Sequence, residues 1–168
     1  DENVWDLYGT RTRVQMQKAC PFELSTFEGY CLLTSSFFSA YMTNTEHRLL
    51  QAERDKTEDN TIILHDFFYK NYDLKIKYDP SDPLKPFVEF DDQIIGSTAE
   101  AFGTIYGNGK LMCTQPVAYD SYYNVCQKFV FLYSTIYVVG KGTVGTYVNI
   151  LEWISDEEAE QYKKEEGL

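Results

Sequence analysis

A strict alternation of apolar and polar side chains over Tyr72–Tyr78 is the feature that most constrains the fold of this chain. One parity holds Tyr72, Leu74, Ile76 and Tyr78, and the other holds Asp73, Lys75 and Lys77. Successive side chains of a β-strand point to opposite faces, so this pattern predicts a half-buried strand. The same period of two runs through Tyr8–Ala19. Strands of this kind must bury their apolar faces against one another, as barrels and sandwiches do.

Further strand signals recur along the chain, separated by turn residues. They cover Thr26–Thr43 (one long bent strand or two), Thr61–Tyr69, Phe87–Ile95, Ala101–Tyr106, Lys110–Gln115, Lys128–Val139 and Thr146–Ile154. Between two of them, Gly107-Asn108-Gly109 supplies the positive φ that a tight hairpin turn demands. These patterns predict an all-β fold, an antiparallel barrel of eight or nine strands. A β-sandwich is the alternative.

The chain is expected to form a single β domain over residues 1–168, with residues 1–7 as an N-terminal linker. Residues 44–60 interrupt the strand pattern with a run of charged and polar side chains. The apolar residues of this segment are Leu49, Leu50 and Ala52. We interpret residues 44–60 as a charged loop or a short helical insertion, with a residue at its start available as a helix cap.

The end of the chain changes from strand to helix. Ser155 is followed three residues later by Glu158, the spacing of a capping box in which each residue satisfies the other's backbone N–H. This motif predicts a short, polar and exposed C-terminal helix over residues 156–166.

Charge and composition restrict the possible partners. The net charge is −11, and Lys and Arg are not clustered, so neither nucleic acid nor an anionic membrane surface is an expected partner. No apolar run approaches the roughly 18–20 residues that a membrane helix needs. Tyrosine and phenylalanine are abundant, with 14 and 11 copies, and such rings favour strands and offer polar-tipped faces to ligands.

Four cysteines leave the redox state open. They are Cys20, Cys31, Cys113 and Cys126, and no two have the CxxC spacing of zinc ribbons or thioredoxin-like motifs. Local pairing of the first two and of the last two would close two short loops. Buried thiols are the alternative, because a domain of this size does not need disulfides and a free cysteine packs as a small hydrophobe.

The Tyr119–Asn124 segment is the strongest candidate for ligand binding. Three tyrosines, Tyr119, Tyr122 and Tyr123, stand beside Asp and Asn, a combination that stacks on sugar rings and bonds their hydroxyls. The alternative interpretation is that these tyrosines cover one end of the barrel. Trp5 and Trp153 are interpreted as structural residues that pack together to close the barrel.

Enzymatic chemistry has little support in the sequence. There is no Gly-x-Ser-x-Gly elbow, and the only histidines are His47, in the charged segment, and His65, beside Asp66. The alternative of a hydrolase would require a serine or cysteine acting with His65. Acidic residues in the loops lack the spacing of a calcium motif; they are Asp79, Asp82, Asp91 and Asp92. We therefore expect no catalytic residues, no metal and no cofactor.

Two stretches resemble known families. Leu7-Tyr8-Gly9-Thr10-Arg11 resembles the opening of lipocalin-like (calycin) barrels, in which a Trp follows the Gly on the first strand, although Arg11 replaces that Trp here. A helix after the last strand is also lipocalin-like. Over its full length the chain is similar in style to exported lipoprotein domains of Bacteroides-type gut bacteria, most of which have no known function.

These resemblances imply an exported protein of the cell envelope, in the periplasm or on the outer-membrane surface, held by a lipid anchor upstream of Asp1. The function expected from the sequence is a non-enzymatic, envelope-associated module that binds a glycan or a peptide. The alternative is a lipocalin-like carrier that holds a small apolar ligand inside a hollow barrel.

Overall fold

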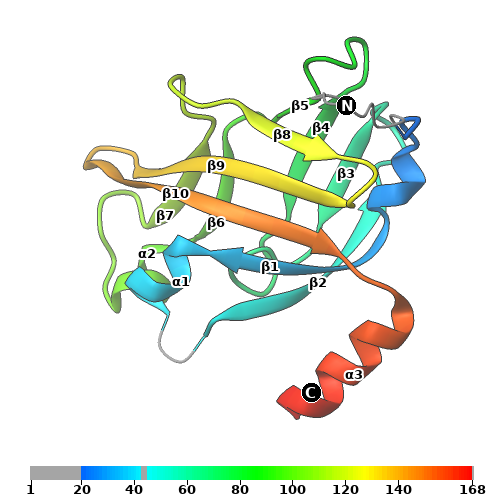
Figure 1. Cartoon of the computed structure of the whole chain (residues 1–168). Coiled ribbons are helices and arrows are strands. Elements are labelled where there is room, and N and C mark those ends of the chain that lie inside the picture. Colours follow the sequence, from blue (N-terminus) through cyan, green and yellow to red (C-terminus); the bar gives the residue numbers. More distant parts are fainter. Residues whose placement is uncertain (1–19, 43–44, 168) are drawn as a thin grey trace, which may run out of the picture.

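The computed structural model describes residues 20–42 and 45–167, and they form an antiparallel β-barrel with a C-terminal helix (Figure 1). The helical elements are η1 (Leu24–Phe27), α1 (Ser36–Tyr41), α2 (Thr98–Phe102) and α3 (Asp156–Glu166). The strands are β1 (Gly29–Ser35), β2 (His47–Arg54), β3 (Thr61–Leu64), β4 (Leu74–Asp79), β5 (Phe87–Glu89), β6 (Gln93–Ser97), β7 (Lys110–Thr114), β8 (Ser121–Asn124), β9 (Phe129–Val138) and β10 (Gly142–Trp153). The predicted all-β fold with a terminal helix is confirmed.

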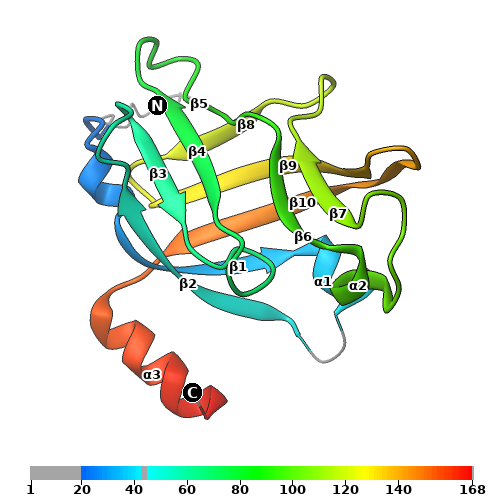
Figure 2. The same cartoon turned by 180° about the vertical axis from the view of Figure 1, so that it is seen from behind.

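Eight strands close the barrel, and two more extend it. The ring runs β1-β2-β3-β4-β5-β8-β9-β10 and closes through the pairing of β10 with β1, while β7 and β6 continue from β9. In Figure 1, strands β8, β9, β10 and β1 face the viewer, and Figure 2 shows β3, β4, β6 and β7 behind them. Every pairing is antiparallel, as expected for a meander.

The two extra strands, β6 and β7, continue the sheet beside one end of β9. β8 pairs with one end of β9 and β7 pairs with the other. β5 then pairs with β8, and β6 pairs with β7. Side-chain amides fill the gaps in the ladder. The Gln93 side chain accepts from the Lys75 N–H on β4 and donates to the Lys75 carbonyl, both at 2.8 Å. The Gln115 side chain accepts from the Phe90 N–H at 3.0 Å. These bonds replace the backbone pairing that the interruptions remove.

Aromatic rings fill the barrel interior. Every second residue of β9 is buried, and the same alternation holds in β4, with Leu74, Ile76 and Tyr78 inside. Phe27 stacks on Tyr78 with ring centroids 4.6 Å apart, and Phe37 stacks on Phe68 at 4.5 Å. Because these inward side chains are fully buried against one another, the barrel is a packed core.

Two predicted segments take a different form. The interpretation of residues 44–60 as a loop or helix was wrong, because β2 occupies His47–Arg54. Leu50 and Ala52 point inward while Gln51, Glu53 and Arg54 face solvent, so a strand with one polar face was mistaken for a polar segment. The second half of Thr26–Thr43 forms α1, since the Ser35 side chain accepts from the Phe37 N–H and caps a helix that buries Phe37 and Phe38.

The predicted hairpin around Asn108 is present on one side only. Ala101–Tyr106 is not a strand, because Ser97 caps α2 and the chain reaches the turn from that helix. The turn itself has Gly107 and Gly109 at positive φ, and it leads into β7. The strands predicted at Lys128–Val139 and Thr146–Ile154 are confirmed as β9 and β10.

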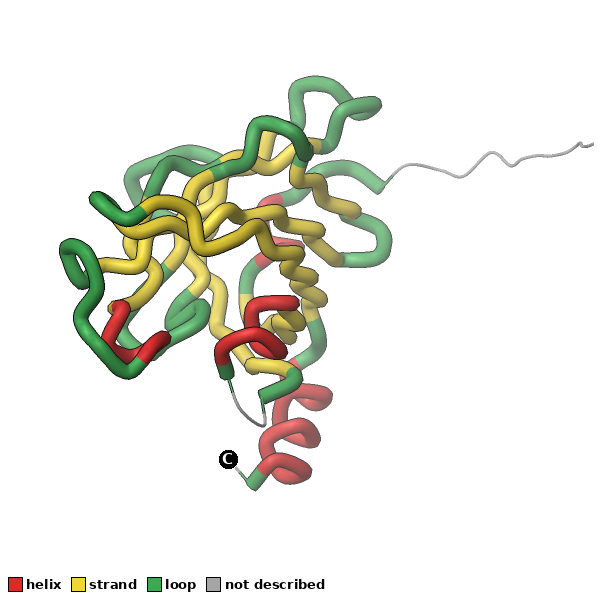
Figure 3. The backbone as a smooth tube through the Cα atoms, turned by 90° about the vertical axis from the view of Figure 1, so that its left-hand side faces the viewer, coloured by secondary structure: helices red, strands yellow, loops and turns green. Residues whose placement is uncertain are grey.

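The C-terminal helix α3 projects from the barrel body (Figure 3). The predicted capping box is confirmed, with Ser155 bonded to the Glu158 N–H and the Glu158 carboxylate bonded to the Ser155 N–H. Ala159 is its one fully buried residue. None of the helices in the described part of the chain has the length and apolarity needed to cross a bilayer.

A single disulfide, between Cys20 and Cys126, joins two segments 106 residues apart. The local pairings considered from the sequence are not formed. Cys31 and Cys113 are buried thiols, because each lies at an inward position of its strand, β1 or β7. Burial raises the pKa of both thiols, that of Cys113 to about 12, so neither is a ready nucleophile. The predicted first strand, the linker and Trp5 lie outside the described residues.

Candidate functional site

A row of side chains crosses the outer face of the barrel over six neighbouring strands. Its members are direct cross-strand partners, in the order Phe87, Tyr122, Phe131, Ile150, Thr34 and His47. The row therefore runs from β5 through β8, β9, β10 and β1 to β2, and its middle four strands face the viewer in Figure 1. At its far end the Thr34 hydroxyl and His47 Nδ1 are hydrogen-bonded at 2.9 Å. The row begins aromatic and ends polar.

The aromatic half of this face is wider than the row. We define the aromatic platform as Phe87, Tyr119, Tyr122, Phe129, Phe131 and Tyr133. Tyr122 stacks on Phe131 at 5.4 Å with planes 7° apart, and Tyr119 stacks on Tyr133 at 4.9 Å. Tyr119 and Tyr122 are 52% and 37% exposed, so each pair keeps ring surface in solvent. Tyrosine and phenylalanine have only two side-chain torsions, so these rings offer contact area at little conformational cost.

Tyr123 does not belong to this surface, which corrects its selection as a ligand-binding residue. It is 6% exposed and lies at an inward position of β8, one residue after outward-facing Tyr122. Its ring packs against Phe22, Phe27 and Tyr78 with centroids 5.3–5.8 Å away. Adjacent strand residues face opposite sides, so these two tyrosines cannot serve one surface. Of the three candidates, the structure brings Tyr119 and Tyr122 together on the outside.

The barrel interior offers less to a ligand than the outer face does. Phe27, Tyr78 and Trp153 fill the end near the disulfide, with Phe27 meeting the Trp153 ring edge-on at 5.1 Å. Trp153 is 7% exposed, in agreement with the structural role expected for it. The interior of an eight-stranded barrel can be filled by side chains or hollow, and here aromatic side chains fill it. This packing weighs against the carrier alternative.

A family model for a domain of unknown function (DUF4984) matches residues 7–165. The chain belongs to the DUF4984 family. No curated protein and no solved structure matches it. The expectation of an uncharacterised domain is thereby confirmed, while the exported lipoprotein type stays a prediction. The match includes the strands that carry the aromatic platform and most of α3, so both are parts of the DUF4984 domain.

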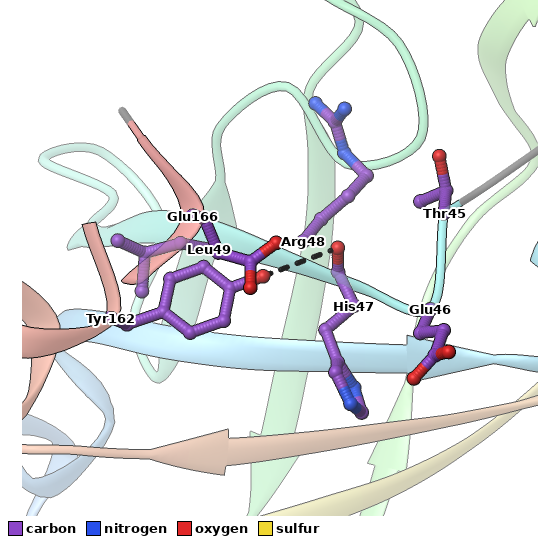
Figure 4. Close-up of a pocket in the computed structure, with 7 residues that line it drawn as sticks. All are labelled: Thr45, Glu46, His47, Arg48, Leu49, Tyr162 and Glu166. Carbon is purple, nitrogen blue, oxygen red and sulfur yellow. Dashed lines mark hydrogen bonds between the residues drawn. The ribbon is translucent and has the colours of Figure 1, made fainter. Parts of the chain in front are cut away.

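The α3 helix of the DUF4984 domain borders the polar end of the row. A surface pocket lies between this helix and β2, with Tyr162 and Glu166 facing the strand (Figure 4). The Tyr162 hydroxyl donates to the His47 carbonyl at 3.5 Å, and Lys163 lies over the Tyr30 ring at 4.7 Å. Arg48 points away from Tyr162 in Figure 4 and donates to two backbone carbonyls after β3 instead. The pocket thus marks where the helix sits against the barrel.

His65 lies apart from the aromatic platform, and both of its ring nitrogens contact carboxylates and not a serine or cysteine. Its Nε2 contacts Glu53 at 2.6 Å and its Nδ1 contacts Asp73 at 3.2 Å, on the outer ends of β2 to β4. Partial burial opposes the charged ring, but the bonds to Glu53 and Asp73 outweigh it and raise the pKa of His65. The hydrolase alternative gains nothing from this arrangement, because both partners of the ring are carboxylates.

The loop acids serve local structure. Asp79 accepts from Ser81, Asp82 accepts from the Leu84 N–H, and Asp92 accepts from Thr114 and Tyr137. The bonds to Thr114 and Tyr137 lower the pKa of Asp92 and keep it charged. Within residues 20–42 and 45–167, no three His, Cys, Asp or Glu side chains gather as metal ligands would.

Replacing His65 with glutamine should make stability less dependent on pH. A raised folded-state pKa stabilises the domain fully below the unfolded value and loses that effect as pH rises through the folded value. The wild type should therefore exceed His65→Gln in unfolding free energy at pH 5.5 by about 0.5 kcal/mol, the size of an exposed pair, and match it at pH 8.5. Urea denaturation at the two pH values measures this. An equal difference at both would show that the ring contributes only by packing.

Sequence reasoning missed Phe87, Phe131 and Ile150 as members of the outer row. Each was recognised as part of a strand, but their alignment depends on register between strands. The available signal was parity. Phe129, Phe131 and Tyr133 share one parity of β9 while the buried residues share the other, which predicts an aromatic outer face of that strand.

Proposed function

We propose that this DUF4984 domain is a non-enzymatic binding module of the cell envelope that holds a glycan on its aromatic platform. The observation that carries the proposal is the set of stacked, half-exposed rings on the outer face of β8 and β9. Sugar rings present flat C–H faces, and an aromatic ring lying parallel to them gains both buried area and dispersion contact.

The electrostatics favour a neutral glycan. The chain carries a net charge of −11, and the platform contributes no cation, so a polymer of acidic sugars would be repelled. Polar groups flank the rings, as glycan hydroxyls require. Asn124 and Thr135 neighbour the platform on β8 and β9, and Glu152 is the cross-strand partner of Phe129.

Among the two ligand classes expected from the sequence, the geometry favours glycan over peptide. Extended peptides commonly bind by adding a strand to a sheet edge, where unpaired backbone groups await them. β8 is paired on both sides by β5 and β9, and β9 lies between β8 and β10. The platform therefore offers ring faces to a ligand, while the backbone N–H and C=O groups of β8 and β9 are already used in pairing with neighbouring strands.

The disulfide supports placement in the envelope. Disulfides persist in the periplasm, on cell surfaces and in secreted proteins, and are rare in a reducing cytosol. Cys126 lies two residues after β8, so the cross-link to Cys20 ties down the end of the strand that carries Tyr122.

The double variant Tyr119→Ala with Tyr122→Ala tests the proposal. Affinity electrophoresis in gels containing β-glucan, xylan or galactomannan should show retardation of the wild type by at least one polysaccharide. The double variant should lose at least about tenfold in affinity, because each ring contributes on the order of 1 kcal/mol.

Ile94→Ala is the control. Ile94 is 38% exposed on β6, which pairs with β7 and carries no platform residue, so its removal should leave retardation unchanged. Unretarded migration of the wild type in all three gels would contradict the proposal. So would equal retardation of the wild type and the double variant.

A further inference from the structure

A second cavity lies at the barrel end formed by α1, α2, the 103–109 loop and the β9–β10 hairpin, which all lie on the left-hand side of Figure 1. Its volume is about 420 Å³, inside the range of about 300–1,000 Å³ typical of small-molecule sites. The lining residues that matter are Tyr41, Phe102, Thr104, Tyr106, Lys141 and Thr143. None of them belongs to the aromatic platform.

Three rings from separate segments form the apolar wall of this cavity. Tyr41 of α1 meets Phe102 of α2 edge-to-face at 5.4 Å, and Phe102 meets Tyr106 edge-to-face at 6.3 Å. Tyr41 also meets the Tyr147 ring of β10 edge-to-face at 6.3 Å. Rings set edge to face present a ring-sized surface that a flat ligand can cover.

Among the described residues, Lys141 is the one charged residue in the wall of this cavity. Its ammonium lies over the Tyr106 ring at 5.1 Å, and no carboxylate of the described residues pairs with it. The pockets beside α3 and beside β4 are each lined by two or more carboxylates. In a chain of net charge −11, a cavity with a lysine and no acid in its wall is complementary to an anion.

Gly107 keeps the wall of this cavity in place. Its φ is +58°, and a Cβ there would lie 2.7 Å from Val138 Cγ1 and 2.8 Å from the Val139 carbonyl oxygen. Only glycine lets the loop that carries Tyr106 lie this close to the hairpin that carries Lys141.

We propose that this barrel-end cavity binds a small ligand made of one six-membered ring with a carboxylate. The ring lies against Tyr41, Phe102 and Tyr106, the carboxylate pairs with Lys141, and the hydroxyls of Thr104 and Thr143 bond the remaining polar atoms. An aromatic acid and a hexuronic acid share this chemistry. The site is separate from the aromatic platform and does not depend on it.

Titration of the ¹⁵N-labelled domain tests the proposal with four probes. Benzoate and D-glucuronate carry the carboxylate, and benzyl alcohol and D-glucose are their neutral counterparts. At least one acid should shift the amide signals of Thr104, Gly142 and Thr143 in a saturable way, and its neutral counterpart should bind several-fold more weakly. Which acid binds distinguishes an aromatic ligand from a sugar.

Lys141→Met should weaken the acid about three- to tenfold, the range from an exposed ion pair to a charge-assisted hydrogen bond, and leave the neutral probe unchanged. Lys85→Met, an exposed lysine in the loop before β5, is the control and should change nothing. Tyr106→Leu should weaken acid and neutral probes alike. Tyr122→Ala should have no effect, which separates this site from the platform.

Four results would overturn the proposal. They are the absence of saturable shifts with either acid, equal affinity for an acid and its neutral counterpart, an unchanged affinity in Lys141→Met, and shifts confined to β8 and residues 129–133. In the last case the ligand would occupy the platform.

Discussion

Tyr123→Ala is expected to destabilise the domain by about 3–5 kcal/mol, the usual cost of removing a large buried ring. Tyr123 is 6% exposed and packs among Phe22, Phe27 and Tyr78, close to the disulfide. Its loss leaves a cavity that the strands around it cannot close. Since 1 kcal/mol shifts the melting temperature of a domain this size by about 2–4 °C, the melting temperature of the variant should fall by roughly 10 °C.

Tyr122→Ala is the control for this prediction, one residue earlier on the same strand. It removes a 37% exposed ring whose main partner is Phe131, so its cost should stay near 1 kcal/mol. Circular dichroism during heating and urea denaturation measures both variants. Similar losses in the two would mean that β8 does not present alternate residues to the core and to solvent.

The contrast between these neighbours shows what the sequence could predict. Alternation in Tyr72–Tyr78 and in Lys128–Val139 determines which side of a strand is buried, and β4 and β9 follow it. In Tyr119–Asn124 the aromatic residues are adjacent, so composition suggested one surface where parity requires two. Applying the strand period to that segment would have separated Tyr122 from Tyr123.

Local charge was a poor guide to secondary structure at β2. A barrel strand needs only one apolar face, and in β2 Leu50 and Ala52 supply it while Gln51 and Glu53 face solvent. Pairing with β1 and β3 stabilises this strand, so tertiary contacts outweigh its polar composition. The two-residue spacing of Leu50 and Ala52 was visible in the sequence, but the many charged residues around it concealed the strand pattern.

Long-range partners lay beyond sequence reasoning. The outer row depends on the register of five strand pairs, and the disulfide joins residues 106 positions apart. Spacing alone favoured the nearest cysteines. The parity of Cys31 within β1 decides against that pairing, because it directs the thiol into the core. Local patterns therefore predict the strands, while the candidate site arises from how the strands align.

Asn149→Leu is expected to destabilise the domain by about 3–4 kcal/mol, although leucine is of similar size and more apolar. Asn149 is fully buried on β10 and links three strands inside the barrel. It accepts from the Ser35 hydroxyl of β1 at 2.5 Å and donates to the Ser134 hydroxyl and the Leu132 carbonyl of β9. Leucine would leave two buried hydroxyls without this partner, at about 1–3 kcal/mol for each.

A second variant separates this network from simple packing. If the cost comes from unpaired hydroxyls, adding Ser134→Ala to Asn149→Leu should recover part of the lost stability, because both partners are then apolar. If the cost comes from misfit of the leucine side chain, the second substitution should add its own loss. Urea denaturation of the wild type, the two single variants and the double variant gives the coupling energy. A coupling energy near zero would mean that Asn149 and Ser134 are neighbours in the core without depending on each other.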